Sequence, residues 1–412
     1  MQAVSQALVA RGHTVLWLTS SDHQARVLTT GAQFVPTDAI AAVDAPLARD
    51  NNTGLLDKSY DHLKCRLLAQ VADYRAVLAN FAADALLVDV FPHAARALCE
   101  LGEIPVYATL GVIPLYTSHY QAPLPASGEW PPTSWMGWLR NAACQVVHRW
   151  IMLPLLLRPH LNQQRRTLRL RDLVFGEPAE QFAYSPSLHI QASSLTLEFG
   201  QVPKPWMHKR HTIFVGPLVT KPIADAAKLP PWWSDILGTR KRVVGITQGT
   251  LATDPTSLII PSIEALQADP CLILVVVSPY VDDIKSLIGS GTNVQYATWL
   301  PYDALLPRLS LLITNGGYGS ITQAISHGVP LLCAGQSEDK RDTAARVTYA
   351  GVGIDLKTDS PSVESVREAA QAILRNETYR SRAQSMSEEL NALGGAEATC
   401  DALEELVRLS GR

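Results

Sequence analysis

The sequence contains 412 residues, with 47% hydrophobic residues, 18% charged residues and a formal net charge of −3. This length predicts two or three domains, because single hydrophobic cores stop growing at about 250–300 residues. The composition is that of a globular protein and excludes a largely disordered chain, and the slightly negative charge argues against a nucleic-acid partner. No segment approaches the roughly 20 consecutive apolar residues that a transmembrane helix needs.

Signals for secretion and disulfide formation are also lacking in the sequence. Residues 1–12 have no basic segment followed by an apolar stretch, as a secretory signal would. The six cysteines show no C-x-x-C spacing, which favours free thiols in a reducing compartment over a disulfide framework or a zinc site. We therefore expect a cytoplasmic protein.

The most apolar segment is Trp150–Leu157, which is short and contains Pro154. We expect a buried core helix here. Peripheral contact with a membrane surface, or a place in the wall of an apolar substrate groove, is the alternative.

Short apolar runs alternate with helix-length amphipathic segments along the chain, a pattern typical of parallel α/β architecture. The continuous Val, Ile and Leu character of these runs predicts strands that are buried on both faces. In the first half, we expect strands at residues 14–20, 33–36, 85–91, 105–110, 188–192 and 212–216. In the second half, we expect them at residues 243–247, 272–278, 294–298, 311–314, 330–334 and 353–357.

A proline-rich connector without helical periodicity separates the two sets of strands. Because parallel sheets bind ligands beyond the carboxyl ends of their strands, we expect the ligand site in a cleft between two domains. The expected units are a Rossmann-like domain at 1–218, a linker at 219–239, a second Rossmann-like domain at 240–395 and a final helix at 396–412.

The most informative motif is a glycine-rich turn between an apolar strand and a helix, Asn315-Gly-Gly-Tyr-Gly-Ser320. Glycines let the backbone approach a ligand closely, and the N–H groups at a helix N-terminus favour a phosphate. The Ser320 hydroxyl adds a donor. A tight turn without a ligand would explain this loop alone equally well.

Two neighbouring features favour the ligand site. Trp299 follows a strand, where a planar indole can stack on a nucleotide base. The loop at residues 335–340 follows the next strand and carries carboxylates and a cation that can bond sugar hydroxyls. Taken singly, a core tryptophan and a solvated loop are the alternatives.

These motifs, in this order, resemble those of the UDP-glycosyltransferase family of inverting enzymes, in particular the microbial branch with macrolide and sterol glycosyltransferases. The resemblance covers nearly the whole chain and is strongest at residues 243–355. It implies a GT-B fold, with two Rossmann-like domains facing a central cleft, and a UDP-sugar as co-substrate without a cofactor. The sequence also lacks an Asp-x-Asp triplet suited to a metal ion beside a diphosphate.

The resemblance implies a role for each part of the donor site. Trp299 and Leu300 would meet the base, the glycine turn and Ser320 the diphosphate, and Asp339 with Lys340 the sugar. A further loop at residues 248–250 resembles the second donor-facing loop of the family. The implied donor-binding residues are Gln248, Gly249, Thr250, Trp299, Leu300, Asn315, Gly316, Gly317, Gly319, Ser320, Gln323, Asp339 and Lys340.

Three of these positions depart from the usual family residue. Asn315 stands where a histidine is usual, and it can donate a hydrogen bond but cannot carry a positive charge. Gln323 stands where a glutamate that binds ribose is common, and Lys340 where glutamine is common. These departures leave the mode of ribose binding and the choice of nucleotide open.

The catalytic base of the family is a histidine after the first strand, polarised by an aspartate that Asp89 matches. No histidine matches that base, since His13 opens what corresponds to the second strand. We expect that the first strand of the amino-terminal domain is missing and that the chain is truncated. His93 is the nearest substitute, and a surface or capping role is expected for it.

The acceptor cleft is expected to draw on residues 111–125 and on the tryptophan-rich region 130–157, which suit a lipophilic small molecule. Core packing explains some of these tryptophans equally well. The expected function is transfer of a hexose, glucose in particular, from a UDP-sugar to an acceptor hydroxyl with inversion. The alternative is a nucleotide-sugar-binding pseudoenzyme that has lost its catalytic histidine.

Overall fold

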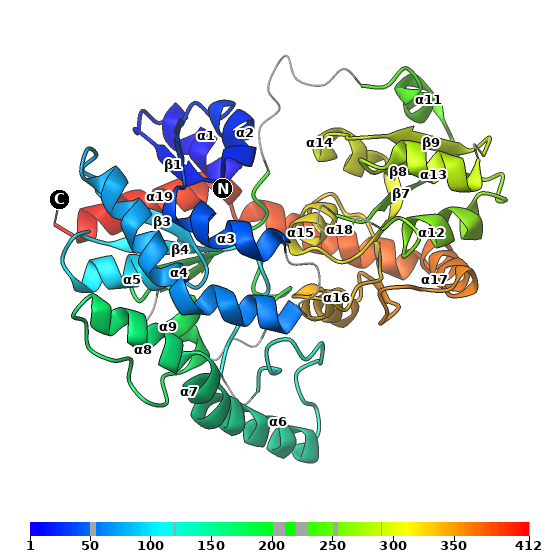
Figure 1. Cartoon of the computed structure of the whole chain (residues 1–412). Helices are drawn as coiled ribbons and strands as arrows, with labels where there is room; N and C mark the ends of the chain where they lie inside the picture. Colours follow the sequence, from blue (N-terminus) through cyan, green and yellow to red (C-terminus); the bar gives the residue numbers. More distant parts are fainter. Residues whose placement is uncertain are drawn as a thin grey trace.

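The structure, a computed structural model, describes residues 1–49, 55–118, 121–200, 211–219, 229–249, 254–289 and 291–411. In these residues every strand pairs in parallel with its neighbours. The strands form one two-stranded, one four-stranded and one six-stranded sheet. The six-stranded sheet lies in one half of the molecule and the other two sheets in the other half (Figure 1).

The second half of the chain builds the six-stranded sheet, in the order β12-β11-β10-β7-β8-β9. Its strands are buried, as their continuous apolar sequences predict. They are β7 (Arg242–Thr247), β8 (Leu272–Val277), β9 (Val294–Ala297), β10 (Leu309–Thr314), β11 (Leu331–Cys333) and β12 (Gly353–Asp355). The helices of this half are α11 (Trp233–Gly238), α12 (Ile259–Leu266), α13 (Val281–Ile288), α14 (Tyr302–Leu305), η3 (Leu306–Arg308), α15 (Tyr318–Ser326), α16 (Lys340–Tyr349), α17 (Val363–Arg375) and α18 (Glu377–Ala392).

The first half builds a β1-β2 pair and a sheet in the order β3-β4-β5-β6. The strands are β1 (Leu16–Thr19), β2 (Gln33–Pro36), β3 (Leu86–Asp89), β4 (Tyr107–Gly111), β5 (Leu188–Gln191) and β6 (His211–Phe214). The helices are α1 (Gln2–Ala10), η1 (Ser21–His23), α2 (Gln24–Leu28), α3 (Ala39–Arg49), α4 (Leu55–Leu78), α5 (His93–Glu100), α6 (Trp135–Val147), η2 (His148–Met152), α7 (Leu153–Leu156), α8 (Arg158–Thr167) and α9 (Ala179–Ala183).

Every strand expected from the sequence is present, and the two-domain α/β architecture is confirmed. The expectation of burial on both faces fails most clearly at three strands, β1, β2 and β3, whose residues stay partly or largely exposed. Within the described residues, β1 pairs only with β2 and β3 only with β4. An edge strand keeps one row of backbone groups and adjoining side chains uncovered, which accounts for this exposure.

The apolar segment around Trp150 is not a core helix, so that prediction is wrong. The segment belongs to α6, η2 and α7, which project from the first half at the bottom of Figure 1. Trp150 keeps 44% of its surface exposed and Leu155 65%. Among the described residues, no helix combines the length and the apolar character that crossing a membrane requires.

The final helix, α19 (Gly395–Leu409), packs against α1 at the opposite end of the chain (Figure 1). Arg11 joins the two helices through ion pairs with Glu397, at 2.9 Å, and Asp401, at 2.6 Å. His13 bonds to Glu404 at 3.0 Å, which agrees with a structural role for this histidine. The last helix thus packs on the first half of the molecule.

The expected linker, 219–239, is described only in part, because residues 220–228 lie outside the described ranges. Its last segment forms α11, whose Trp233 and Ile236 are buried in one apolar core with Leu309 and Leu312 of the second half. This part of the linker therefore packs with the six-stranded sheet. The exact domain limits stay a prediction.

Candidate functional site

Four loops leave the carboxyl ends of β7, β9, β10 and β11, which lie at one edge of the six-stranded sheet because all these strands are parallel. The strand order reverses between β7 and β10, and ligands of such sheets bind at this kind of switch point. The loops begin at Gln248, Thr298, Asn315 and Ala334. Most of the described donor-site residues lie in these loops. Gly319, Ser320 and Gln323 follow in α15, and Lys340 is the first residue of α16.

Asn315 is the point where three of these loops meet. A Cβ atom on Gly249 would lie 3.2 Å from Asn315 Oδ1, and one on Gly335 would lie only 2.1 Å from the Asn315 carbonyl oxygen. Gly316 has φ +89°, a conformation that side-chain-bearing residues rarely adopt. Asn315 itself is buried. Glycine at these positions therefore allows the separate loops to pack closely against one another.

Helix α15 begins in the glycine-rich turn and presents an uncapped N-terminus. Gly317 is the N-cap residue, so no side chain bonds to the first backbone N–H groups. A Cβ atom on Gly317 or Gly319 would meet nothing within 4 Å, so the space in front of the helix is open. An open helix N-terminus with its positive dipole end is suited to a phosphate.

Trp299 is exposed over 62% of its surface, so the core-tryptophan alternative is wrong. The following residue, Leu300, is 3% exposed and packs in the apolar core of the second half. Leu300 therefore anchors the loop, and only its backbone remains for contact with a nucleotide. The Tyr302 hydroxyl lies 3.2 Å from Ser320 Oγ, which ties the Trp299 loop to the start of α15.

The acidic loop ends at α16, where Asp339 is the N-cap residue. Desolvation by burial raises the pKa of the Asp339 carboxyl. Lys340 is buried, and its Nζ atom lies 2.9 Å from Ser337 Oγ and 3.2 Å from Glu338 Oε2. The ammonium group is thus held by its own loop, which leaves Asp339 as the more suitable partner for a sugar hydroxyl.

The side chains of the remaining expected donor residues make hydrogen bonds within the protein or lie outside the described ranges. Gln248 is buried, and its amide donates to the Asp254 carbonyl oxygen at 2.7 Å and to Ser257, so it braces its own loop. Gln323 Nε2 donates to the Gly319 carbonyl oxygen at 3.2 Å, which folds its side chain back along α15. Thr250 lies outside the described residues.

Asp89 ends β3, in the first half of the molecule. Desolvation by the surrounding protein raises its pKa although part of the carboxyl meets solvent, and the Val90 N–H, which donates to Oδ1 at 2.8 Å, acts in the opposite direction. Among the described residues, no imidazole is hydrogen-bonded to this carboxylate. The structure therefore presents Asp89 without the partner base that the family pattern implies.

His93 is the first residue of α5 and makes no side-chain capping bond, so the capping role is wrong. It is half-buried, which also differs from the expected surface position. Desolvation, together with the positive charges of Arg96 and Arg165, lowers its pKa to about 4. The imidazole is therefore neutral near pH 7 and is a weak base.

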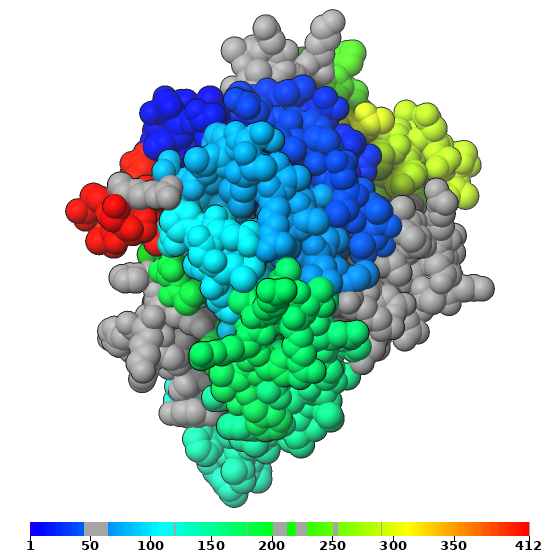
Figure 2. Space-filling view, turned by 60° about the vertical axis from the view of Figure 1, so that its left-hand side comes forward, coloured from blue at the N-terminus to red at the C-terminus, as the bar shows by residue number. Residues whose placement is uncertain are grey.

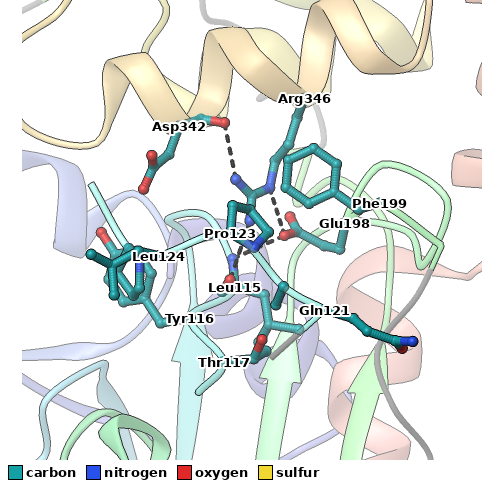
Figure 3. Close-up of a pocket in the computed structure, with 12 residues that line it drawn as sticks. Leu115, Tyr116, Thr117, Gln121, Pro123, Leu124, Glu198, Phe199, Asp342 and Arg346 are labelled. Atoms are coloured by element: carbon teal, nitrogen blue, oxygen red, sulfur yellow. Dashed lines mark hydrogen bonds and ion pairs between the residues drawn. The ribbon is translucent and has the colours of Figure 1, made fainter. Parts of the chain in front are cut away.

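A buried polar network joins the donor turn to the first half, and no motif in the sequence indicates it. The hydroxyl of Tyr318, inside the glycine-rich turn, donates to Glu198 Oε1 at 2.6 Å and accepts from Gln191 Nε2 at 2.7 Å. Arg346 of α16 binds the other oxygen of Glu198 at 2.7 Å (Figure 3). These partners are up to 148 residues apart, so no local pattern could have revealed them.

The same interface holds a loop of the first half against α16. Asp342 accepts hydrogen bonds from the backbone N–H groups of Ala126, at 2.6 Å, and Gly128, at 2.8 Å. The Arg346 guanidinium lies over the Phe199 ring, 4.6 Å from its centre, in the small pocket that Figure 3 shows. Residues 121–125, expected in the acceptor cleft, line this pocket.

The expected acceptor tryptophans are not gathered in one groove. Trp130 lies at the interface, where its indole N–H donates to Thr348 Oγ1 at 3.2 Å and its ring packs edge-on against Tyr349. Trp135, Trp138 and Trp150 are instead exposed on the projecting helices. The tryptophan-rich region therefore splits into an interface residue and an outward-facing group.

Comparisons with known proteins agree with this geometry. Residues 266–406 match the family model described as "Erythromycin biosynthesis protein CIII-like, C-terminal domain". The chain is 31% identical over 419 residues to 4'-demethylrebeccamycin synthase of Lentzea aerocolonigenes, covering 99% of this chain and 96% of that protein. It is 37% identical over 182 residues to UDP-glucosyltransferase A1 of Starmerella bombicola, covering 43% of this chain and 38% of that protein.

Solved structures resemble the whole fold. The glycotransferase of kitacinnamycin superposes with a TM-score of 0.72 at 20% identity, covering 98% of this chain and 94% of that structure. The spinosyn rhamnosyltransferase SpnG complexed with thymidine diphosphate superposes with a TM-score of 0.67 at 20% identity, covering 98% and 95%.

Proposed function

This chain belongs to the UDP-glycosyltransferase family, and from that premise we propose that it transfers a hexose from a UDP-sugar to a hydroxyl group of a lipophilic small molecule. The observation that carries the donor half of the proposal is the link between two loops. An exposed Trp299 and the open N-terminus of α15 are joined through the contact between Tyr302 and Ser320. A flat ring beside a phosphate-binding helix end suits a nucleoside diphosphate.

In this proposal, Trp299 stacks on the base and the first N–H groups of α15 bind the diphosphate. These groups also stabilise the negative charge that develops on the departing diphosphate, and they supply this stabilisation without a metal ion or a cofactor. Asn315 contributes a neutral hydrogen-bond donor at the meeting point of the loops. Asp339 accepts hydrogen bonds from the sugar, for which we propose glucose.

Inversion requires a single displacement at the anomeric carbon. The acceptor oxygen forms its bond to that carbon on the face opposite the diphosphate, while the bond from the carbon to the diphosphate oxygen breaks. The acceptor proton passes to a base. We propose that Asp89 lies on the acceptor side of this reaction, where its raised pKa favours proton exchange near neutral pH more than an ordinary carboxylate would.

A protein that binds nucleotide sugars without transferring them is the less favoured alternative. The relative that aligns with 99% of this chain is named as a synthase. The transferase and the binding protein are distinguished by incubating the whole chain with UDP-glucose and hydrophobic phenolic acceptors. Mass spectrometry then detects any glycosylated product, and NMR gives its anomeric configuration. A product with the configuration opposite to that of the donor supports the proposal, and UDP binding without any transfer contradicts it.

The donor assignment is tested by isothermal titration with UDP. We expect Trp299→Ala to weaken UDP binding by roughly 5- to 150-fold, because stacking of a base on an aromatic side chain is worth about 1–3 kcal/mol. Trp135→Ala is the matched control, since Trp135 is also exposed but lies outside the four loops. An affinity for UDP that is unchanged in Trp299→Ala would contradict the stacking role of Trp299.

A further inference from the structure

The segment from Trp135 to Leu156, formed by α6, η2 and α7, is called the arm below. The arm buries two amide side chains and exposes most of its large apolar side chains. Asn141 and Gln145 are both buried, and their amides donate to the carbonyl oxygen of Ala122 at 2.7 and 3.2 Å. A helix that packs for stability alone buries its apolar face. The reversed orientation indicates that the outer face has another partner.

The outward side chains form a large apolar surface. Contiguous exposed apolar patches of this kind mark interaction sites in proteins. The exposed large apolar residues of the arm are Trp135, Met136, Trp138, Leu139, Val146, Val147, Trp150, Ile151, Met152, Leu155 and Leu156. The arm forms the lower, protruding end of the molecule in the space-filling view, so this surface is accessible from outside (Figure 2).

Positive charges outnumber negative ones in this part of the sequence. The arm itself contains no Asp or Glu, and residues 135–176 contain seven arginines but only one acidic residue, Asp172. Three of these arginines form ion pairs, Arg140 with Glu129, Arg165 with Glu100 and Arg166 with Asp172. Arg149 and Arg158 instead bond to backbone carbonyl oxygens. In the described part of the chain, neither of these two guanidinium groups lies within salt-bridge distance of a carboxylate, although Arg158 is close enough to Asp172 to interact with its charge.

Arginine and exposed aromatic rings are also combined at the end of the arm. The Arg149 guanidinium lies 5.3 Å from the centre of the Trp150 ring, and that of Arg158 lies 5.3 Å from the centre of the Phe175 ring. Trp150 and Phe175 are in contact, with ring centres 5.7 Å apart, and both are exposed. Aromatic rings beside basic groups are typical of segments that rest at the boundary between lipid headgroups and acyl chains.

We propose that the arm binds the surface of an anionic lipid bilayer and lies in the plane of the interface. The tryptophans and aliphatic side chains enter the upper acyl region, and the arginines remain at the phosphate level. A second copy of the chain is a poorer occupant, because a symmetric contact between two arms would bring arginines of like charge together. The three helical segments of the arm, of 13, 5 and 4 residues, are each shorter than a membrane-spanning helix.

Binding of the arm to a membrane would also bring the enzyme close to its lipophilic acceptors. This second part of the inference rests on the proposed function. Lipophilic acceptors partition into membranes. A transferase held at the interface by its first half would meet them there at a higher concentration than in water. The membrane contact itself does not depend on transfer, and the two can be tested separately.

The test is co-sedimentation of the whole chain with vesicles, either of phosphatidylcholine alone or of phosphatidylcholine with phosphatidylglycerol. We expect binding to the anionic vesicles and much weaker binding to the neutral ones. The variant Trp135→Ser/Leu139→Ser/Leu155→Ser should bind roughly 100-fold more weakly or worse, because it removes three exposed apolar groups that would enter the bilayer. Arg149→Gln/Arg158→Gln should lose the preference for anionic vesicles.

The controls separate this proposal from the previous one. Trp299→Ala should co-sediment like the unmodified chain, and the arm variant should keep its thermal midpoint and its affinity for UDP, because the altered side chains are exposed. Absence of co-sedimentation, or unchanged binding of the arm variant, overturns the membrane proposal. Dimers that light scattering detects in the unmodified chain but not in the arm variant, without vesicle binding, also overturn it in favour of self-association.

Discussion

The ion pair between Glu198 and Arg346 offers a direct measure of how strongly the two halves are joined. Both side chains are almost fully buried, with 1% and 6% of their surfaces exposed, and their atoms lie 2.7 Å apart. Removing one partner from a buried pair costs about 3–5 kcal/mol, since an uncompensated charge remains. In Arg346→Met, Glu198 keeps two donors, the Tyr318 hydroxyl and the Leu115 N–H.

We therefore expect Arg346→Met to lower the free energy of unfolding by about 3 kcal/mol, near the lower end of that range. The lost contact with the Phe199 ring adds about 0.5–2 kcal/mol. Glu198→Gln should cost a similar amount, because the guanidinium then keeps only carbonyl partners. The double variant should cost less than the sum, with a coupling energy of about 2 kcal/mol or more.

The assay is equilibrium unfolding in urea, followed by both far-UV circular dichroism and tryptophan fluorescence so that separate unfolding of the two halves is detected. Arg140→Met is the matched control, because the Arg140–Glu129 pair has a similar 2.6 Å distance but is largely exposed. Exposed pairs are worth about 0–1 kcal/mol. The reasoning is refuted if Arg346→Met costs no more than Arg140→Met, or if the two interface substitutions are additive within about 0.5 kcal/mol.

Other substitutions test the donor turn and the pH dependence of stability. Gly335→Ala should destabilise the chain and weaken UDP binding, because its Cβ would lie 2.1 Å from the Asn315 carbonyl oxygen; Gly319→Ala should weaken only UDP binding in titration, because its Cβ meets nothing. Tyr318→Phe should cost about 1–3 kcal/mol in urea unfolding, since a hydrogen bond to the buried Glu198 is lost; an unchanged midpoint argues against the network. The pKa of His93, about 4 in the folded chain, lies below the ordinary value of 6.5, so the unfolded chain takes up the proton first as the pH falls. Stability should therefore fall between pH 6.5 and 4 by roughly 3 kcal/mol at most, and His93→Asn should flatten this part of a plot of unfolding free energy against pH.

The strands and the loops at their carboxyl ends are predictable from the sequence because both depend on neighbouring residues. A buried parallel strand reads as a continuous apolar run, and the turn at Asn315 combines glycines with a following helix within ten residues of chain. Trp299 also follows a strand, β9, as predicted. Its exposure excludes a core role, and the stacking role stays a prediction.

The parts that the sequence did not predict depend on which residues meet across the molecule. Glu198 and Arg346 are ordinary polar residues until folding brings them together over a separation of 148 residues. The arm differs from its predicted burial for a related reason. Its apolar residues suggested burial, but the inward side is taken by Asn141 and Gln145, whose partner is a backbone carbonyl of a distant loop.

The packing of α19 on α1 has a consequence for exchanging parts between relatives. A chimera that takes everything after residue 240 from another family member would also replace α19, and it would lose the partners of Arg11 at Glu397 and Asp401. A donor half therefore cannot be transplanted by a single crossover without remaking a contact in the recipient half. Two crossovers, the second between α18 and α19, would exchange the six-stranded sheet and keep the native first half closed by its own final helix.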